Sequence, residues 1–127
     1  MPTGLRIESR EDGEECVLTL AGELSLAKAH VLEQRLGEAL AASSARIVID
    51  LAQVEFIDST GLSVLVRAHQ RASERDVELG LVNLRAQASR LLSLTGLTER
   101  LTLAHHPQAS KSRARTGSDL AEPGPAA

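Results

Sequence analysis

Hydrophobic and polar positions in the first part of the chain predict three strands and one helix. The segments 5–9, 16–22 and 46–51 are apolar runs of strand length, and Asp12-Gly13 between the first two is a hairpin-type turn. Between the second and third runs, Ser25 precedes apolar residues at helical spacing, and we expect it to cap that helix. The apolar positions of the helix are Ala29, Leu32, Leu36, Ala39 and Leu40.

The second part of the chain repeats this alternation. We expect a loop or short extension of the strand up to Asp58, then a helix from Ser59 to about Glu74. A strand at 77–82, a helix at 84–96 ended by Gly96 and a last strand at 100–104 follow. The apolar side of the helix that begins at Ser59 comprises Leu62, Leu65, Val66 and His69, widened by Val64, Ala68 and Ala72.

This order of elements predicts one α/β domain over residues 1–104. Alternating strands and helices favour later strands that are mostly parallel and joined by right-handed crossovers. Residues 105–127 are rich in Ala, Ser, Pro and Gly and lack a periodic apolar pattern. We therefore expect a disordered C-terminal tail, in which Lys111, Arg113 and Arg115 are solvated charges.

Composition argues against several classes of partner. Phe56 is the single aromatic residue and the formal net charge is −3, so neither base stacking nor phosphate attraction is favoured, and we expect no nucleic acid partner. The N-terminal segment has no apolar signal core and no apolar run approaches spanning length, which predicts a cytoplasmic protein that does not bind membranes. The lone Cys16 excludes an internal disulfide and is expected to pack as a small hydrophobe.

No catalytic set is evident in the sequence. There is no Gly-rich phosphate loop, no paired zinc-ligand spacing and no Gly-x-Ser-x-Gly elbow. His69 follows Ser59 by about three helical turns, roughly 15 Å in a regular helix, and His30 lies in the first helix. His105-His106 is a weak metal signal. We expect no enzyme activity, no cofactor and no metal site.

The turn formed by Asp58, Ser59, Thr60 and Gly61 has two interpretations. Asp, Ser and Thr are good N-caps, so these residues can simply begin the helix. Alternatively, a hydroxyl at a helix N-terminus is well placed to carry a phosphate, because the N–H groups and helix dipole favour negative charge there.

The surrounding sequence resembles the STAS family, and within it the bacterial anti-sigma factor antagonists. The resemblance covers about residues 5–104 and is strongest in FIDSTGLSVLV, where an apolar strand, Asp-Ser-Thr-Gly and an apolar helix follow one another. Gly22-Glu23-Leu24 and Leu94-Thr95-Gly96-Leu97 match in order and spacing. The resemblance implies a STAS fold, with a mixed, mostly parallel sheet of about five strands and helices packed on it.

The resemblance also implies a function. Such antagonists bind an anti-sigma factor when unmodified and so free a sigma factor. The anti-sigma factor is often an ATP-dependent serine kinase that phosphorylates the serine of the motif, here Ser59, until a phosphatase restores it. Thr60 is a second candidate phosphoacceptor. The partner-binding residues are expected to be Glu23, Ser25, Asp58, Ser59, Thr60 and Gly61.

Two features leave alternatives open. Ser25 stands where these antagonists commonly have Asp, and this difference affects the choice of partner and the efficiency of phosphorylation. Arg67, Arg71 and Arg75 form a basic stripe along the second helix. We interpret this stripe as a solvated face rather than as a docking stripe for an acidic partner. The main rival function is a non-phosphorylated STAS interaction or ligand-sensing module. The third hypothesis is a small hydrolase that uses Ser59 as its nucleophile.

Overall fold

Strands and helices alternate along the part of the chain that the computed structural model describes, which is residues 4–42 and 45–102. The predicted tail, with its histidine pair and basic cluster, lies outside these residues. The elements are β1 (Leu5–Asp12), β2 (Glu15–Leu24), the short 3-10 helix η1 (Leu26–Lys28), α1 (Ala29–Ala41), β3 (Arg46–Ile57), α2 (Ser59–Glu74), β4 (Glu78–Val82), α3 (Ala86–Ser93) and α4 (Thr98–Leu101).

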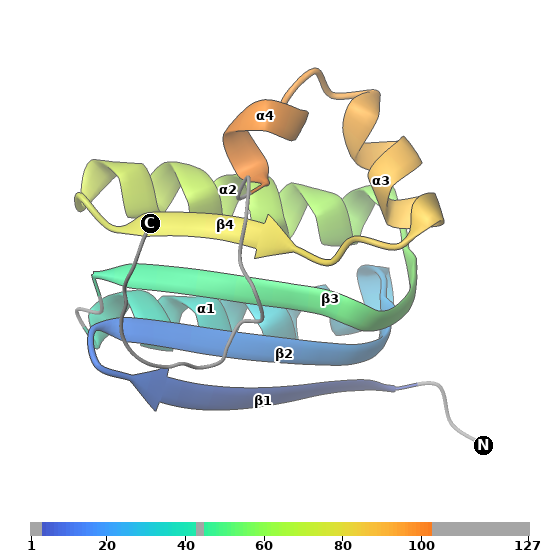
Figure 1. The fold of residues 1–127 in the computed structure, drawn as a ribbon. Helices are drawn as coiled ribbons and strands as arrows, with labels where there is room; N and C mark the ends of the chain where they lie inside the picture. Colours follow the sequence, from blue (N-terminus) through green and yellow to red (C-terminus); the bar gives the residue numbers. More distant parts are fainter. Residues whose placement is uncertain (1–3, 43–44, 103–127) are drawn as a thin grey trace, which may run out of the picture.

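The described strands form one mixed sheet in the order β1-β2-β3-β4 (Figure 1). β1 pairs antiparallel with β2 through the predicted hairpin, whereas β2 with β3 and β3 with β4 are parallel. The predicted α/β class and mostly parallel sheet are confirmed. The loop or extension expected after Leu51 is an extension, because β3 continues to Ile57 and reaches the end of β2.

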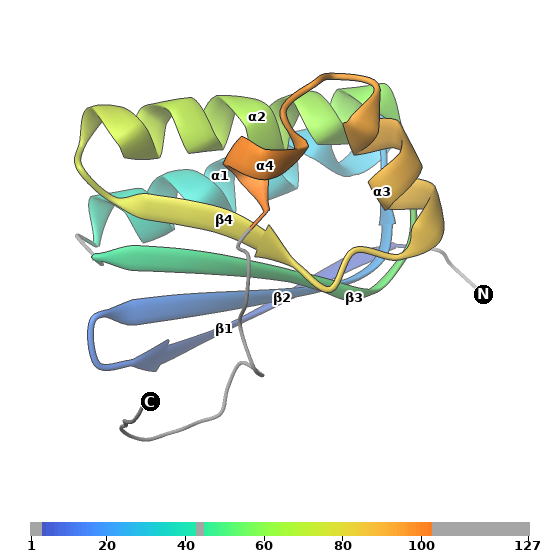
Figure 2. The same ribbon diagram turned by 45° about the horizontal axis from the view of Figure 1, so that its top comes forward.

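α1 and α2 lie side by side on one face of the sheet (Figures 1 and 2). All five apolar positions predicted for α1 are buried, and α2 has the predicted bounds with Leu62, Val64 and Leu65 in the core. The main core therefore lies between these two helices and the sheet. Because neighbouring strand residues point to opposite faces, Val17, Val48 and Val82 form a small second cluster on the other face.

The fifth strand predicted at 100–104 is wrong in its described part. Residues 98–101 form α4, and of the described residues beyond it Thr102 makes one isolated parallel bridge with Leu81. The N–H groups of Arg100 and Leu101 both donate to the Leu97 carbonyl, 3.0 and 2.9 Å away, which winds the chain helically. Five residues of alternating polarity do not distinguish a strand from such a turn.

The helix predicted at 84–96 is shorter than expected. α3 ends at Ser93, and turns carry the chain to Gly96, whose φ of +75° is in the left-handed region that glycine adopts without strain. The side-chain hydroxyl of Thr95 accepts the Leu97 N–H at 3.0 Å. The predicted end of the helix at Gly96 is therefore wrong by three residues, and Gly96 instead closes the turn between α3 and α4, which begins at Thr98.

Cys16 lies on β2 with its thiol in the main core, where only 4% of the residue is exposed. Burial raises the pKa of the Cys16 thiol, and the negative charge of Glu11 raises it further. The predicted role as a small core hydrophobe is confirmed.

We expect Cys16 to react with a thiol reagent such as Ellman's reagent at least about a hundredfold more slowly in the folded protein than in urea, since the buried thiol reacts only when the structure opens. The raised pKa also lowers the thiolate fraction at pH 8 relative to a free thiol. Rates are followed by absorbance with and without denaturant. Equal rates in the folded and the unfolded protein would show that the Cys16 side chain lies on the exposed face of the sheet and not in the main core.

Candidate functional site

The predicted site residues meet at the carboxyl ends of β2 and β3. Leu24 and Ile57 are register partners in these parallel strands, so the segments after them emerge side by side. The Asp58 N–H donates to the Leu24 carbonyl at 3.1 Å. The structure thereby brings Glu23 and Ser25 to the same edge of the sheet as the Asp58-Ser59-Thr60-Gly61 turn.

The Asp58 carboxylate joins two helix N-termini. Its Oδ1 accepts the Gly61 N–H at 2.8 Å, which makes Asp58 the N-cap of α2 as predicted. Its Oδ2 accepts the Leu26 N–H at 3.1 Å, at the start of η1. The expected capping role of Ser25 is wrong, because its side chain makes no cap hydrogen bond and the acceptor comes instead from Asp58, which follows β3.

Ser59 is the first residue of α2, and its side chain is exposed. Thr60 follows in the same turn and is partly buried. The first N–H groups of a helix have no acceptor within it, and together with the helix dipole they favour negative charge. Of the two candidate phosphoacceptors, Ser59 is the more accessible.

Gly61 is buried where α2 crosses the end of β2. A Cβ at this position would overlap the Leu24 carbonyl oxygen and come within 2.8 Å of the Leu24 Cγ. The absence of a side chain is therefore required by packing inside the domain. Partner access is not needed to explain this glycine.

Sequence reasoning missed Gln87, which fixes the same turn from α3. Its Oε1 accepts the Ile57 N–H at 3.0 Å, and its Nε2 donates to the Ile57 carbonyl at 2.8 Å. Both backbone groups of the residue before Asp58 are thus held by one side-chain amide. No local pattern signals this contact, because the two residues are 30 positions apart.

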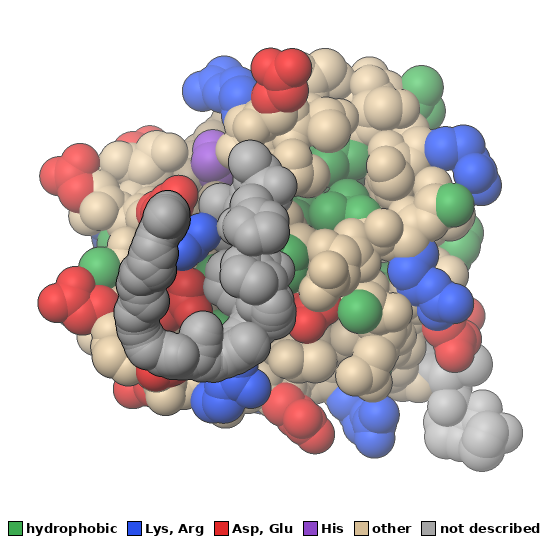
Figure 3. All heavy atoms as spheres, in the orientation of Figure 1, with side chains coloured by type: hydrophobic (Ala, Val, Ile, Leu, Met, Phe, Trp, Pro, Cys, Tyr) green, Lys and Arg blue, Asp and Glu red, His purple; other side chains and the backbone are tan. Residues whose placement is uncertain are grey.

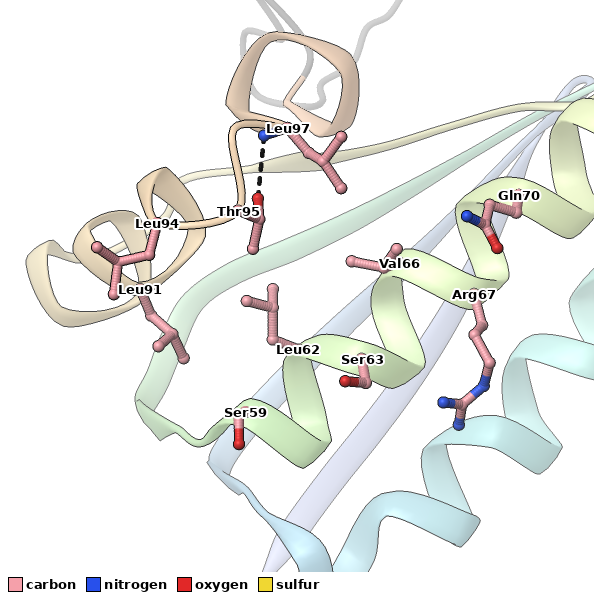
Figure 4. A pocket seen from close by; sticks show the side chains of 10 residues that line it. All are labelled: Ser59, Leu62, Ser63, Val66, Arg67, Gln70, Leu91, Leu94, Thr95 and Leu97. Carbon is pink, nitrogen blue, oxygen red and sulfur yellow. Dashed lines mark hydrogen bonds between the residues drawn. The ribbon is translucent and has the colours of Figure 1, made fainter.

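A groove of about 490 Å³ opens between α2 and α3, and we call it the α2–α3 groove. Figure 4 shows Leu62 and Val66 on α2 facing Leu91 and Leu97 across it, whereas the side chain of Leu94, another lining residue, points outward from α2. Ser59 lies at one end. The other lining residues are Ser63, Arg67, Gln70 and Thr95.

Three large apolar side chains near the site are exposed to solvent. Leu94 is 82% exposed, Leu26 71% and Phe56 44%, although leucine and phenylalanine are normally buried. Leu26 follows Ser25, Phe56 lies near the end of β3, and Leu94 borders the α2–α3 groove. The exposure of Leu94 could have been predicted from the sequence, because residues 91–94 include three leucines and one side of a short helix cannot bury all of them.

The basic stripe of α2 is partly neutralised. Arg67 and Arg71 both approach one carboxylate, that of Glu33 on α1, at 3.3 and 3.9 Å. Their side chains remain about half exposed. The stripe therefore faces solvent, as predicted, and also links α2 to α1.

The histidine of α2 contacts the sheet, and the possible metal ligands among the described residues do not form a cluster. The ring nitrogen Nδ1 of His69 donates to the Leu79 carbonyl at 3.0 Å, so this histidine is engaged with β4. Among residues 4–42 and 45–102, no cluster of His, Cys, Asp or Glu could hold a metal ion. The same residues contain no helix long and apolar enough to cross a membrane.

A sheet with helices packed on one face and a capped strand-to-helix turn at its carboxyl edge defines a small α/β domain of a known class. Residues 6–110 match the STAS domain model, and the chain belongs to the STAS domain family. The family was expected from the sequence, and this expectation is confirmed.

Relatives and solved structures agree with this assignment. The chain is 30% identical over 102 residues to the anti-sigma-F factor antagonist RsfB of Mycobacterium tuberculosis, covering 80% of this chain and 83% of that protein. It is 30% identical over 95 residues to the anti-sigma-B factor antagonist of Bacillus subtilis, covering 75% and 86%. The crystal structure of an anti-sigma factor antagonist from Mycobacterium paratuberculosis is similar with a TM-score of 0.73 at 29% identity, covering 80% and 86%.

We expect Asp58→Ala to lower the free energy of unfolding by about 1–3 kcal/mol, because it removes the cap of α2 and the acceptor of the Leu26 N–H. Urea unfolding followed by circular dichroism measures the loss. Glu55→Ala, which removes an exposed carboxylate from the same end of β3, serves as the control and should change stability by less than about 0.5 kcal/mol. Equal effects of the two substitutions would contradict the bridging role.

Two Gly→Ala substitutions should act in opposite directions. Gly61→Ala forces its methyl group into Leu24 and should destabilise the protein by about 2 kcal/mol or more. Gly37→Ala in α1 meets no atom within 4 Å and should stabilise it by up to about 1 kcal/mol through helix propensity. Thermal unfolding of both variants tests the pair, and a neutral Gly61→Ala would refute the close approach of α2 to β2.

Proposed function

We propose that this chain is an anti-sigma factor antagonist. It binds an anti-sigma factor while Ser59 is unmodified, which frees a sigma factor, and it releases the anti-sigma factor once Ser59 is phosphorylated. The curated relatives at 30% identity carry the name of such antagonists. The structural observation that supports the proposal best is the exposed Ser59 hydroxyl at the start of α2, at one end of an apolar groove.

The chemistry of phosphorylation explains the direction of the switch. The Ser59 Oγ attacks the γ-phosphorus of ATP, ADP leaves, and the hydroxyl proton passes to a base of the kinase. The product carries a charge of about −1.5 to −2 at neutral pH. The N-terminus of α2 tolerates this charge, whereas a partner surface that fits a neutral hydroxyl and apolar side chains does not.

In this proposal the chain is a substrate and a binding partner, not an enzyme. The kinase is the anti-sigma factor itself, and a protein phosphatase reverses the modification. The chain contributes the hydroxyl of Ser59 and a surface that includes Glu23, Ser25 and the Asp58–Gly61 turn. Thr60 remains the second candidate acceptor, and its partial burial makes it the poorer one. We assign the process to the cytoplasm, where ATP and sigma factors are found.

One observation favours a second candidate. The α2–α3 groove of about 490 Å³ is large enough to hold a small molecule. A STAS module that senses a ligand or binds a partner without phosphorylation would use this groove and leave Ser59 unmodified.

Site-resolved mass spectrometry after incubation with ATP, Mg²⁺ and a lysate from the source organism tests the proposal. We expect phosphate on Ser59 in the unaltered protein and in Thr60→Val, and none at that site in Ser59→Ala. Ser59→Ala should also retain its partner in the presence of ATP, because the hydroxyl that triggers release is gone.

The controls separate the two candidates. The lysate must phosphorylate a general kinase substrate added to the same reaction, which shows that kinases are active. An unmodified Ser59 under these conditions, with partner retention unaffected by ATP in both the unaltered protein and Ser59→Ala, would refute the switch and favour the constitutive binding module.

A further inference from the structure

The α2–α3 groove presents an apolar surface that the described chain leaves uncovered. Five of its lining residues are leucine or valine, and Leu94 at its edge is 82% exposed. Figure 3 shows hydrophobic side chains in a hollow between the α3 and α4 regions. No polar or charged residue in the described ranges is buried, so the groove lacks the enclosed polar groups that orient a small ligand. An aliphatic side chain from another protein fits this lining better.

Positive charge flanks this surface. Residues 59–102 carry six arginines and four acidic residues, whereas residues 1–58 carry five basic and eleven acidic residues. On the α2 side, Arg67 and Arg71 share the single carboxylate of Glu33, which leaves one positive charge of the cluster uncompensated. On the α3 side, Arg90 is exposed and forms no ion pair with any described residue.

Arg67 and Arg90 both lie close to the α2–α3 groove. Arg67 is itself a lining residue at the rim, where its side chain points towards α1 (Figure 4). Arg90 lies one helical turn before Leu94, the C-cap residue of α3, so both are on the same side of this helical segment. Each of the two helices that form the groove thus carries an exposed arginine near it, Arg67 at the rim on α2 and Arg90 on α3.

We propose that the α2–α3 groove receives an aliphatic side chain from an acidic segment of the anti-sigma factor, whose carboxylates pair with Arg67 and Arg90. This inference rests on the proposed function and specifies the chemistry of the partner. It also accounts for release. Ser59 lines one end of the same groove, so a phosphate there repels the segment that the arginines attract.

Three blocked synthetic peptides of equal length serve as probes. The first has leucines at helical spacing and glutamates elsewhere, the second replaces each glutamate with lysine, and the third replaces each leucine with alanine. Each is titrated into the ¹⁵N-labelled full chain and followed by NMR. We expect the first to shift the amide signals of Leu62, Leu91 and Leu94, and the other two to bind at least about fivefold more weakly, the effect of two exposed charge pairs or of lost apolar contact.

A charge-reversal variant makes the test specific. Arg67→Glu combined with Arg90→Glu should transfer the preference to the lysine peptide. Arg6→Glu combined with Arg10→Glu changes the net charge equally on β1, at the opposite edge of the sheet, and should keep the preference for the glutamate peptide. Circular dichroism establishes that both variants fold, and both arginine pairs are exposed.

Several results would overturn the inference: stronger binding of the lysine peptide to the unaltered protein, shifts confined to another surface, no peptide binding up to millimolar concentration, or an equal change of preference in the β1 variant. The experiment contains neither kinase nor ATP. Its failure therefore leaves phosphorylation of Ser59 unaffected, and an unmodified Ser59 in the lysate leaves the peptide result standing.

Discussion

One carboxylate holds the candidate site together. The two oxygens of Asp58 accept N–H groups from the first turn of α2 and from the start of η1, which lie after adjacent parallel strands. The first N–H groups of a helix have no acceptor within it, so a single carboxylate between the two starts satisfies one group of each. Because the two chain segments leave the sheet side by side, the positions of Ser25, Leu26 and Ser59 all depend on this contact.

Two further contacts fix the turn from other directions. Gly61 lets α2 approach the Leu24 carbonyl more closely than any side chain permits, and Gln87 holds both backbone groups of Ile57 from α3. The turn is therefore determined by the sheet, by α2 and by α3 together. A group added to the exposed Ser59 hydroxyl meets solvent rather than this packed interior. Under the proposed function, such a site signals through surface charge and does not require the fold to rearrange.

Local periodicity predicted most of the fold, and contacts between distant residues account for its failures. The strand and helix patterns placed β1 to β4, α1, α2 and the cap at Asp58, because each depends on neighbouring residues. Ser25 also looked like a cap, but the acceptor for the Leu26 N–H comes from a residue 32 positions away. Gln87 acts across 30 positions and leaves no trace in its own segment. The strand expected at 100–104 failed because its alternation is equally compatible with the helical turn that follows Gly96.

The structure also bears on which partner the site would select. The STAS resemblance places an acidic residue where Ser25 stands, and the Ser25 side chain makes no cap hydrogen bond, so the substitution leaves the fold intact. It removes a negative charge from the edge of the sheet that carries Ser59. Arg67 of α2 lines the groove that has Ser59 at one end, and Arg90 lies exposed on α3. Specificity is a difference between affinities, and both features disfavour a basic partner surface and favour an acidic one. If the chain is an antagonist, its charges select among anti-sigma factors while its apolar groove supplies the affinity.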